Sequence, residues 1–299
     1  MSSRRSLTRE ASPDLWSQVS IVGLGLIGGS LARALRERLP NLRLLGIDRE
    51  EVASSADARA LVERCISEQD ASAVAEAFAT SDLVFLATPV HAIRRWLGPA
   101  LAHRAVVTDC GSTKRAIASA ARGLPGAARF IPGHPMAGAG AGRAAASGDL
   151  FEGRPWVLCP EETAAPAACD LVEQLVVRLG ARPIRMSADA HDRAVAIVSH
   201  APRLAASALT SLAAREGAFG AAGPAFERLL RGAGGDARVW RDVLDSNSDE
   251  VARTLRSVIR ELEECATELE RGGLEHCLRT LAEADAARAQ FEARDRTAE

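Results

Sequence analysis

The stretch Gly23-Leu24-Gly25-Leu26-Ile27-Gly28 decides the fold of this chain. It follows a short apolar run at residues 19–22 and leads into a stretch with leucines at helical spacing. A G-x-G-x-x-G sequence between a strand and a helix is typical of a turn that binds a dinucleotide. The first glycine permits the tight turn, the second lets the backbone approach a pyrophosphate, and the third lets the helix lie close to the strand. The stretch therefore predicts a Rossmann-type fold.

Apolar runs alternate with helical stretches from residue 17 to about residue 186. Strands that alternate with helices predict a doubly wound, mostly parallel sheet with helices on both faces. Gly23, Asp48, Thr88-Pro89 and Asp109 each stand at the carboxyl end of a run, where open α/β sheets bind their ligands. The predicted strands are residues 19–22, 42–47, 83–87, 105–108, 129–131, 156–158 and 182–186.

After residue 186 the pattern becomes helical throughout. Residues 187–214, 238–271 and 275–296 carry apolar side chains at helical intervals, with interruptions at Pro202 and at Gly272-Gly273. So long an apolar stripe packs in a core or in a dimer seam. We therefore predict a disordered tail at residues 1–15, a dinucleotide-binding domain at 16–186 and an all-helical substrate and dimerisation domain at 187–299.

Composition excludes several classes of function. The formal net charge of −2 leaves no excess of cations for nucleic acid. No apolar stretch is long enough to span a membrane, and the first residues lack the apolar core of a signal peptide. The six cysteines show no CxxC spacing, and His191 and His200 have no third ligand at the spacing of a metal site. We expect a cytoplasmic protein with reduced thiols, a small-molecule substrate and no metal.

The choice of dinucleotide depends on Asp48, twenty residues after Gly28. An acid at the end of the second predicted strand accepts hydrogen bonds from the adenosine ribose and repels a 2′-phosphate, which favours NAD over NADP. The neighbouring Arg49 leaves an alternative, because it is able to meet that phosphate, to lie over the adenine or to remain a surface residue. The predicted cofactor-binding residues are Gly23, Gly25, Leu26, Ile27, Gly28, Asp48, Arg49, Thr88 and Pro89.

A histidine lies in a second glycine-containing segment, Gly133-His134-Pro135-Met136-Ala137-Gly138. Oxidation by a nicotinamide cofactor removes a hydride and leaves a proton, and a neutral imidazole accepts a proton well near pH 7. His134 is therefore a candidate base of a dehydrogenase; the alternative is a histidine that only satisfies backbone carbonyls. The chain also has a single lysine, Lys114. Either a compact ammonium is required there, since the planar fork of arginine is no substitute, or one lysine has persisted by chance.

Several segments together resemble the prephenate and arogenate dehydrogenases of tyrosine biosynthesis. Their motifs G-x-G-L-I-G-G-S, D-x-G-S-x-K, G-H-P-M-A-G, S-H-L-P-H and T-R followed by W-R-D recur here in the same order. The matching segments are Gly23–Ser30, Asp109–Lys114, Gly133–Gly138, Ser199–Arg203, Arg231 and Trp240–Asp242.

The resemblance implies an NAD-dependent oxidative decarboxylation of prephenate to 4-hydroxyphenylpyruvate by a cytoplasmic homodimer. A hydride leaves C4 of the ring, the 4-hydroxyl loses its proton, CO₂ leaves C1 and the ring becomes aromatic. His134 would accept the hydroxyl proton, and Ser112 would hydrogen-bond either His134 or the nicotinamide. Arg231 would clamp a substrate carboxylate from the helical half, which implies a site between the two halves. Lys114 would orient the substrate or hold its loop.

Three more residues are implied near the substrate: Ser199, His200 and Arg203. His200 is equally well explained as a structural histidine on an apolar helical face. Arg203 replaces a histidine of the family motif, and the run Ala139-Gly140-Ala141-Gly142 lacks an acid that many prephenate-specific relatives carry. The Arg203 cation disfavours the ammonium of arogenate, whereas the missing acid is a trait of arogenate-using relatives.

Other functions remain as alternatives. The first is an arogenate or dual cyclohexadienyl dehydrogenase that gives tyrosine. The second is a dehydrogenase of the β-hydroxyacid type, but the catalytic lysine that such enzymes carry in the helical half is missing here. The third is a non-catalytic NAD sensor, which the presence of Ser112, Lys114, His134 and Arg231 disfavours.

Overall fold

The computed structural model describes residues 16–138 and 145–296. The predicted tail at residues 1–15 and the run Ala139–Gly142 lie outside the described residues. The chain divides into two compact units, residues 1–195 with 234–247 and residues 196–233 with 248–299. The first unit thus extends beyond the sheet to take in two helices of the C-terminal half.

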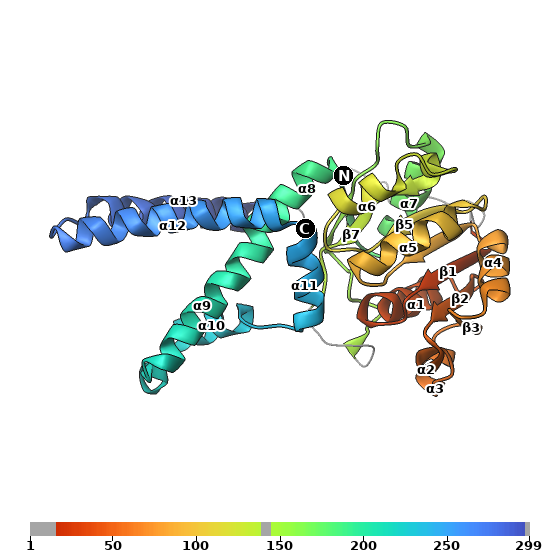
Figure 1. Ribbon diagram of the computed structural model, residues 1–299, viewed down its shortest axis with the longest axis horizontal. Coiled ribbons are helices and arrows are strands. Elements are labelled where there is room, and N and C mark those ends of the chain that lie inside the picture. The colour runs from red at the N-terminus through yellow and green to blue at the C-terminus, as the bar shows by residue number, and fades with distance from the viewer. Residues whose placement is uncertain (1–15, 139–144, 297–299) are drawn as a thin grey trace, which may run out of the picture. The chain divides into compact units, whose positions relative to one another are not determined.

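A six-stranded parallel sheet is the centre of the first unit (Figure 1). Its order is β3-β2-β1-β4-β5-β6, and the direction of strand progression reverses between β1 and β4. That reversal is the place at which doubly wound sheets bind ligands, and the fold class predicted from the sequence is confirmed. The strands are β1 (Gln18–Val22), β2 (Arg43–Asp48), β3 (Arg64–Ser67), β4 (Leu83–Leu86), β5 (Val106–Asp109) and β6 (Phe130–Ile131).

Strand β3 is absent from the prediction. Only Ile66 of its four residues is buried, because the strand lies at the edge of the sheet and pairs on one side with β2. An edge strand of this kind needs no apolar run, and so it leaves little signal in the sequence.

Helices cover both faces of this sheet. Successive side chains of a strand point to opposite faces, so Phe85 of β4 packs in one apolar core and Val84 in another. The first core is closed by α1 (Leu26–Arg38) and α7 (Pro166–Arg178), and the second by α4 (Ala71–Thr80), α5 (Val90–Leu101) and α6 (Arg115–Ala121). Two single-turn helices, α2 (Glu50–Ala53) and α3 (Ala56–Arg59), follow β2.

A second sheet of three strands corrects two expectations. The sequence places residues 156–158 and 182–186 in the parallel sheet, but β8 (Pro155–Leu158) and β9 (Arg182–Arg185) pair with each other instead. The segment around His134 belongs to the same small sheet, because β7 (Gly133–Pro135) pairs antiparallel with β8. Trp156 of β8 is fully buried and packs against Phe151 and Phe85, which anchors this small sheet on the first core.

The predicted helix over 187–214 is divided in the structure. It consists of α8 (Ala188–Val195), a π-helical turn η3 (Ala196–His200) and α9 (Ala201–Arg215), with Pro202 in the first turn of α9. The predicted helix over 238–271 is likewise two helices, α11 (Ala237–Ser246) and α12 (Ser248–Glu270). The interruption is Asn247, whose buried side chain hydrogen-bonds Arg115 and the backbone of Asp192. Helices α8 and α11 belong to the first unit.

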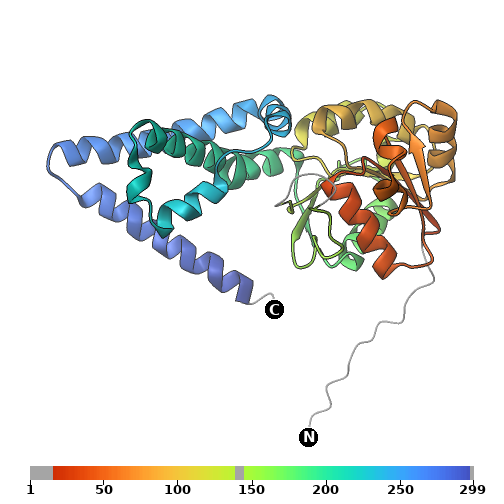
Figure 2. The ribbon, with the colours of Figure 1, turned by 90° about the horizontal axis from the view of Figure 1, so that it is seen from below.

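The second unit is all-helical (Figure 2). Its helices after α9 are η4 (Ala218–Ala221), α10 (Pro224–Gly232), α12 and α13 (Glu275–Arg296), and Gly272, with a φ of +77°, turns the chain between α12 and α13. The long helices leave large apolar side chains exposed, such as Leu262, Leu278 and Leu281. A protein surface this apolar marks an interaction site. Among the described helices, none is long and apolar enough to cross a membrane.

Candidate active site

The glycine turn has the geometry that a dinucleotide requires. Gly23 has a φ of +91°, and a Cβ there would lie 2.8 Å from the carbonyl oxygen of Ala87. A Cβ at Gly28 would overlap the carbonyl oxygen of Gly23, so helix α1 is able to lie against the turn only without one. Within residues 16–138 and 145–296, nothing lies against Gly25 and no side chain caps the helix that follows it. The first N–H groups of α1, from Leu26 and Ile27 onward, therefore offer an anion site for a pyrophosphate.

Asp48 lies at the carboxyl end of β2, next to this turn. Its carboxylate accepts the backbone N–H of Leu24 at 2.7 Å and that of Arg49 at 2.7 Å. The side chain is half-buried, whereas Arg49 is exposed. Each carboxylate oxygen keeps lone-pair capacity for the hydroxyls of a ribose.

The segment that follows β4 contributes Thr88 and Pro89 on the other side of the reversal in strand order. Pro89 caps α5. The Thr88 hydroxyl is buried and has no hydrogen-bond partner among the described residues, and the Thr88 methyl lies beside Gly23. Buried polar groups normally have partners, so an unsatisfied hydroxyl beside the glycine turn fits a site that a bound dinucleotide completes.

His134 begins a chain of three ionisable side chains. Its Nδ1 lies 2.8 Å from Nε2 of His191, and Nδ1 of His191 lies 2.8 Å from the Asp192 carboxylate. A carboxylate only accepts, so His191 carries its proton on Nδ1 and accepts at Nε2. His134 then carries its proton on Nδ1, which leaves the lone pair on Nε2. The network therefore selects the tautomer in which His134 acts as a base through Nε2.

Burial and hydrogen bonding determine the protonation states of His191 and Asp192. Desolvation lowers the pKa of His191, which keeps its imidazole neutral. Burial alone would raise the pKa of Asp192, but hydrogen bonds from His191 and from the backbone of Arg115 and Lys114 outweigh it and lower that pKa. The result is an ionised carboxylate beside a neutral imidazole, a pair that orients His134 without competing for its proton.

Lys114 is fully buried and does not reach the surface. Its ammonium forms an ion pair with Asp109, which is also fully buried, and donates to the carbonyl oxygen of Gly133 at 2.7 Å. Burial raises the pKa of Asp109, and the neighbouring ammonium opposes that rise. Of the two roles considered for Lys114, holding the loop is the one that these contacts favour.

Ser112 lies half-buried between β5 and α6. Within the described part of the chain, no hydrogen bond from its hydroxyl to His134 is recorded. The role of Ser112 toward His134 or the nicotinamide stays a prediction.

The remaining predicted substrate residues belong to the second unit. Ser199 is exposed on η3, and His200, the last residue of η3, is buried. Arg203 is half-buried in the first turn of α9, and Arg231 is exposed near the end of α10. Their contacts with a substrate stay predictions.

Sequence reasoning missed the partners of His134. It considered His191 only as a metal ligand, and it gave Asp192 and Asp109 no catalytic or positioning role. His191 and His134 are 57 residues apart, and no local sequence pattern predicts contact between two residues so far apart. The available signal was a His-Asp dipeptide among alanine and valine residues on a buried helical face.

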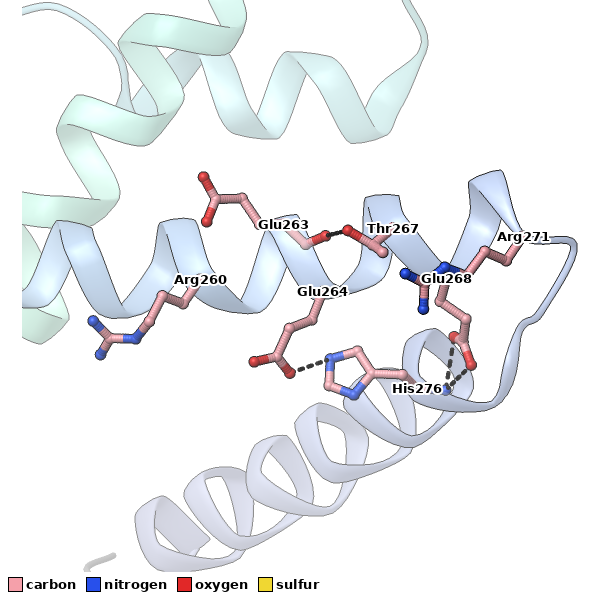
Figure 3. A pocket seen from close by; sticks show the side chains of 7 residues that line it. All are labelled: Arg260, Glu263, Glu264, Thr267, Glu268, Arg271 and His276. Carbon is pink, nitrogen blue, oxygen red and sulfur yellow. Dashed lines mark hydrogen bonds and ion pairs between the residues drawn. The ribbon is translucent and has the colours of Figure 1, made fainter.

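A pocket of about 430 Å³ lies where α12 meets α13 (Figure 3). Its side chains are mostly charged, and Glu268 accepts the backbone N–H groups of His276 and Cys277 at the start of α13. Glu261, Glu264 and His276 have side-chain atoms close together. Both glutamates are exposed, and the His276 imidazole faces Arg279 through Nδ1 at 2.7 Å. These contacts account for the cluster as charge pairing between two helices.

No disulfide joins the six cysteines, all of which lie in the described part of the chain. Burial raises the pKa of Cys110, and it raises the pKa of Cys159 to about 12. Both thiols next to the Asp109–Lys114 pair are therefore protonated and unreactive, since the thiolate is the nucleophile.

Comparisons with known proteins identify the family of this chain. Residues 31–185 match the family "Prephenate dehydrogenase, nucleotide-binding domain", and residues 187–283 match "Prephenate dehydrogenase, dimerization domain". A prephenate dehydrogenase of Bacillus subtilis is 30% identical over 274 residues, which cover 87% of this chain and 72% of the relative. A cyclohexadienyl dehydrogenase of Zymomonas mobilis is 28% identical over 264 residues, 85% and 88% of the two chains.

The fold is shared with a solved structure of the same kind. The arogenate dehydrogenase of Synechocystis superposes with a TM-score of 0.74 at 29% identity, and the match covers 92% of this chain and 99% of that one. The two matched families together account for most of the sequence. The chain therefore belongs to the prephenate dehydrogenase family and is an NAD-dependent dehydrogenase.

Proposed function

We propose that this chain oxidises and decarboxylates prephenate to 4-hydroxyphenylpyruvate in tyrosine biosynthesis. The observation that carries the proposal is the His134–His191–Asp192 chain, which leaves a basic nitrogen on His134 beside the carboxyl end of β5. Relatives that act on this class of cyclohexadienol support it, among them the prephenate dehydrogenase of Bacillus subtilis.

The residues divide the chemistry among themselves. Bound NAD⁺ supplies the acceptor for the hydride that leaves C4 of the ring. His134 takes the proton of the 4-hydroxyl at Nε2 as the C4–O bond gains carbonyl character, and His191 with Asp192 stabilises the imidazolium that forms. The C1–CO₂ bond then breaks, its electron pair aromatises the ring, and the proton returns from His134 to the oxygen at C4. The products are CO₂, NADH and a phenol.

Cofactor choice is expected to follow Asp48. Asp48→Ala should reduce the preference for NAD⁺ over NADP⁺, measured as the ratio of the two kcat/KM values, by about tenfold or more. The reason is that two like charges about 4 Å apart repel by ~4 kcal/mol near a protein surface, against ~1 kcal/mol in bulk water. Asp57→Ala, at an exposed position on α3, is the control. Equal kcat/KM for both cofactors in the unmodified chain would contradict the role of Asp48.

Arg231 is expected to bind a substrate carboxylate through its planar fork. Arg231→Ala should raise KM for prephenate roughly 10- to 150-fold, since a hydrogen bond to a charged group contributes ~1.5–3 kcal/mol. The rise falls on KM because a carboxylate clamp holds the ground state as well as the transition state. Arg215→Ala, an exposed arginine at the end of α9, is the control. An unchanged KM would assign Arg231 to structure.

We infer that prephenate is preferred to arogenate. The two substrates differ in their side chain, where prephenate has a keto group and arogenate an ammonium, and the Arg203 cation disfavours the ammonium. Arg203→Gln is therefore expected to raise kcat/KM for arogenate relative to prephenate. If the ratio does not move, Arg203 does not face the side chain and other residues make the choice.

One assay tests the proposed function as a whole. The unmodified chain is supplied with NAD⁺ and either prephenate or arogenate, and NADH is followed by its absorbance. Faster NADH formation with prephenate is the expected result. Faster formation with arogenate would replace the proposed substrate by its amino analogue, and no NADH with either would leave the chain a non-catalytic NAD-binding protein.

We also infer a homodimer formed by the second unit. The exposed leucines of α12 and α13 and the match to a dimerization domain support it. We further infer that it is a cytoplasmic enzyme with a small-molecule substrate.

A further inference from the structure

The hydrogen bonds around His134 close into a ring that passes twice through Lys114. On one side, the Lys114 ammonium donates to the carbonyl oxygen of Gly133, the residue bonded to His134. On the other side, the Lys114 backbone N–H donates to the Asp192 carboxylate at 2.6 Å. Asp192 accepts from His191, and His191 accepts from His134. One residue thus holds both the backbone and the imidazole of His134.

Asp109 also binds the backbone of Gly133, the residue before His134. Its carboxylate accepts the N–H of Gly133 at 3.1 Å and forms the ion pair with Lys114. This one ion pair therefore binds both the backbone N–H and the backbone C=O of Gly133. A Cβ at Gly133 would lie 2.8 Å from the Asp109 carbonyl oxygen, so the strand β7 approaches the end of β5 as closely as a glycine allows.

We propose that the buried Asp109–Lys114 pair is a positioning device that sets the place and the tautomer of His134. The inference rests on the proposed function of His134 as the base. Lys114 is fully buried and its ammonium is held by protein groups, so it acts through Gly133 and Asp192 and does not touch the substrate. A point charge with freely rotating N–H donors suits two acceptors in so confined a space, which explains why an arginine does not stand here.

The double variant Asp109→Asn/Lys114→Met tests this, because it removes both buried charges together and leaves neither unpaired. We expect kcat with prephenate to fall about ten- to a hundredfold, as a small misplacement of a reacting group does. KM for prephenate and the affinity for NAD⁺ should change little. If the double variant does not fold, Asp109→Asn alone carries the same expectation, because a neutral amide no longer holds the Lys114 ammonium by charge against the carbonyl oxygen of Gly133.

Thr108→Val is the matched control. Thr108 precedes Asp109 in β5, and its buried hydroxyl donates to the carbonyl oxygen of Ile131 at 2.7 Å. Loss of this hydroxyl weakens the fold nearby and leaves both hydrogen bonds to Gly133 in place. We expect this variant to keep its kcat. An equal fall of kcat in Thr108→Val, or a rise of KM in place of a fall of kcat in the double variant, would overturn the proposal.

A spectroscopic measurement separates the inference from the proposed function. With ¹⁵N-labelled histidine, the ring signals of His134, identified by their loss in His134→Ala, should show the proton on Nδ1 in the unmodified chain and a mixture of tautomers in the double variant. An unchanged tautomer would refute the positioning role. If the unmodified chain forms no NADH from prephenate or arogenate, the proposed function fails, and the tautomer still decides the role of the ion pair.

Discussion

His134→Ala is expected to lower kcat for prephenate oxidation by ~10²–10⁴, the range for the loss of a positioned acid–base group. The loss should fall on kcat and on kcat/KM alike, because the proton moves in the transition state. Binding of NAD⁺, measured by calorimetric titration, should be nearly unchanged, since the glycine turn and Asp48 lie on other strands. The control is His103→Ala, a half-exposed histidine in the turn after α5.

The same mechanism predicts the direction of the pH dependence. His134 works as a base only while its Nε2 lone pair is available, so kcat/KM should fall as the pH is lowered and the imidazole gains a proton. The lowered pKa of His191 keeps that residue neutral as the pH falls, which assigns the loss to His134. If His134→Ala retains more than about a tenth of the kcat of the unmodified chain, His134 is not the base of the reaction.

The parts of the site that a local chemical requirement dictates were predictable from the sequence. Gly23 and Gly28 are such cases, because no side chain fits where the turn meets Ala87 and where α1 meets the turn. The same holds for Asp48, which stands at the end of a buried strand. In each case a few consecutive residues contain the whole physical reason, and so the pattern alone indicates the structure.

The parts that depend on long-range packing were not predictable. The pairing of His134 with His191 requires β7 and α8 to meet, and nothing in either segment specifies its partner. The sequence also shows Lys114 as the only lysine but not that it is buried, because its burial depends on Asp109 and Gly133 together. Likewise, α11 packs with the first unit through contacts such as His91 with Asp242 at 2.6 Å, which its amphipathic pattern does not reveal.

The largest expected effect on stability comes from Lys114→Met. Removing one partner of a buried ion pair leaves the other charge without compensation, and this typically costs ~3–5 kcal/mol of unfolding free energy. For a chain of this size, each 1 kcal/mol lowers Tm by about 2–4 °C, so a fall of roughly 6–20 °C is expected. Arg64→Met is the control: Arg64 pairs with Glu76 at 3.2 Å on the surface, where an ion pair contributes at most ~1 kcal/mol.

The double variant decides whether this loss reflects an unpaired charge or a badly filled cavity. When Asp109→Asn accompanies Lys114→Met, no buried charge remains, and replacement of a whole buried pair is often nearly neutral. We therefore expect Asp109→Asn/Lys114→Met to recover most of the lost Tm. Its kcat should stay low, because the hydrogen bond from the Lys114 ammonium to the carbonyl oxygen of Gly133 is still missing. Thermal unfolding is compared at one protein concentration, since a dimer's Tm depends on it. If the double variant is as unstable as Lys114→Met, packing around the lysine stem, and not charge pairing, accounts for the stability of this site.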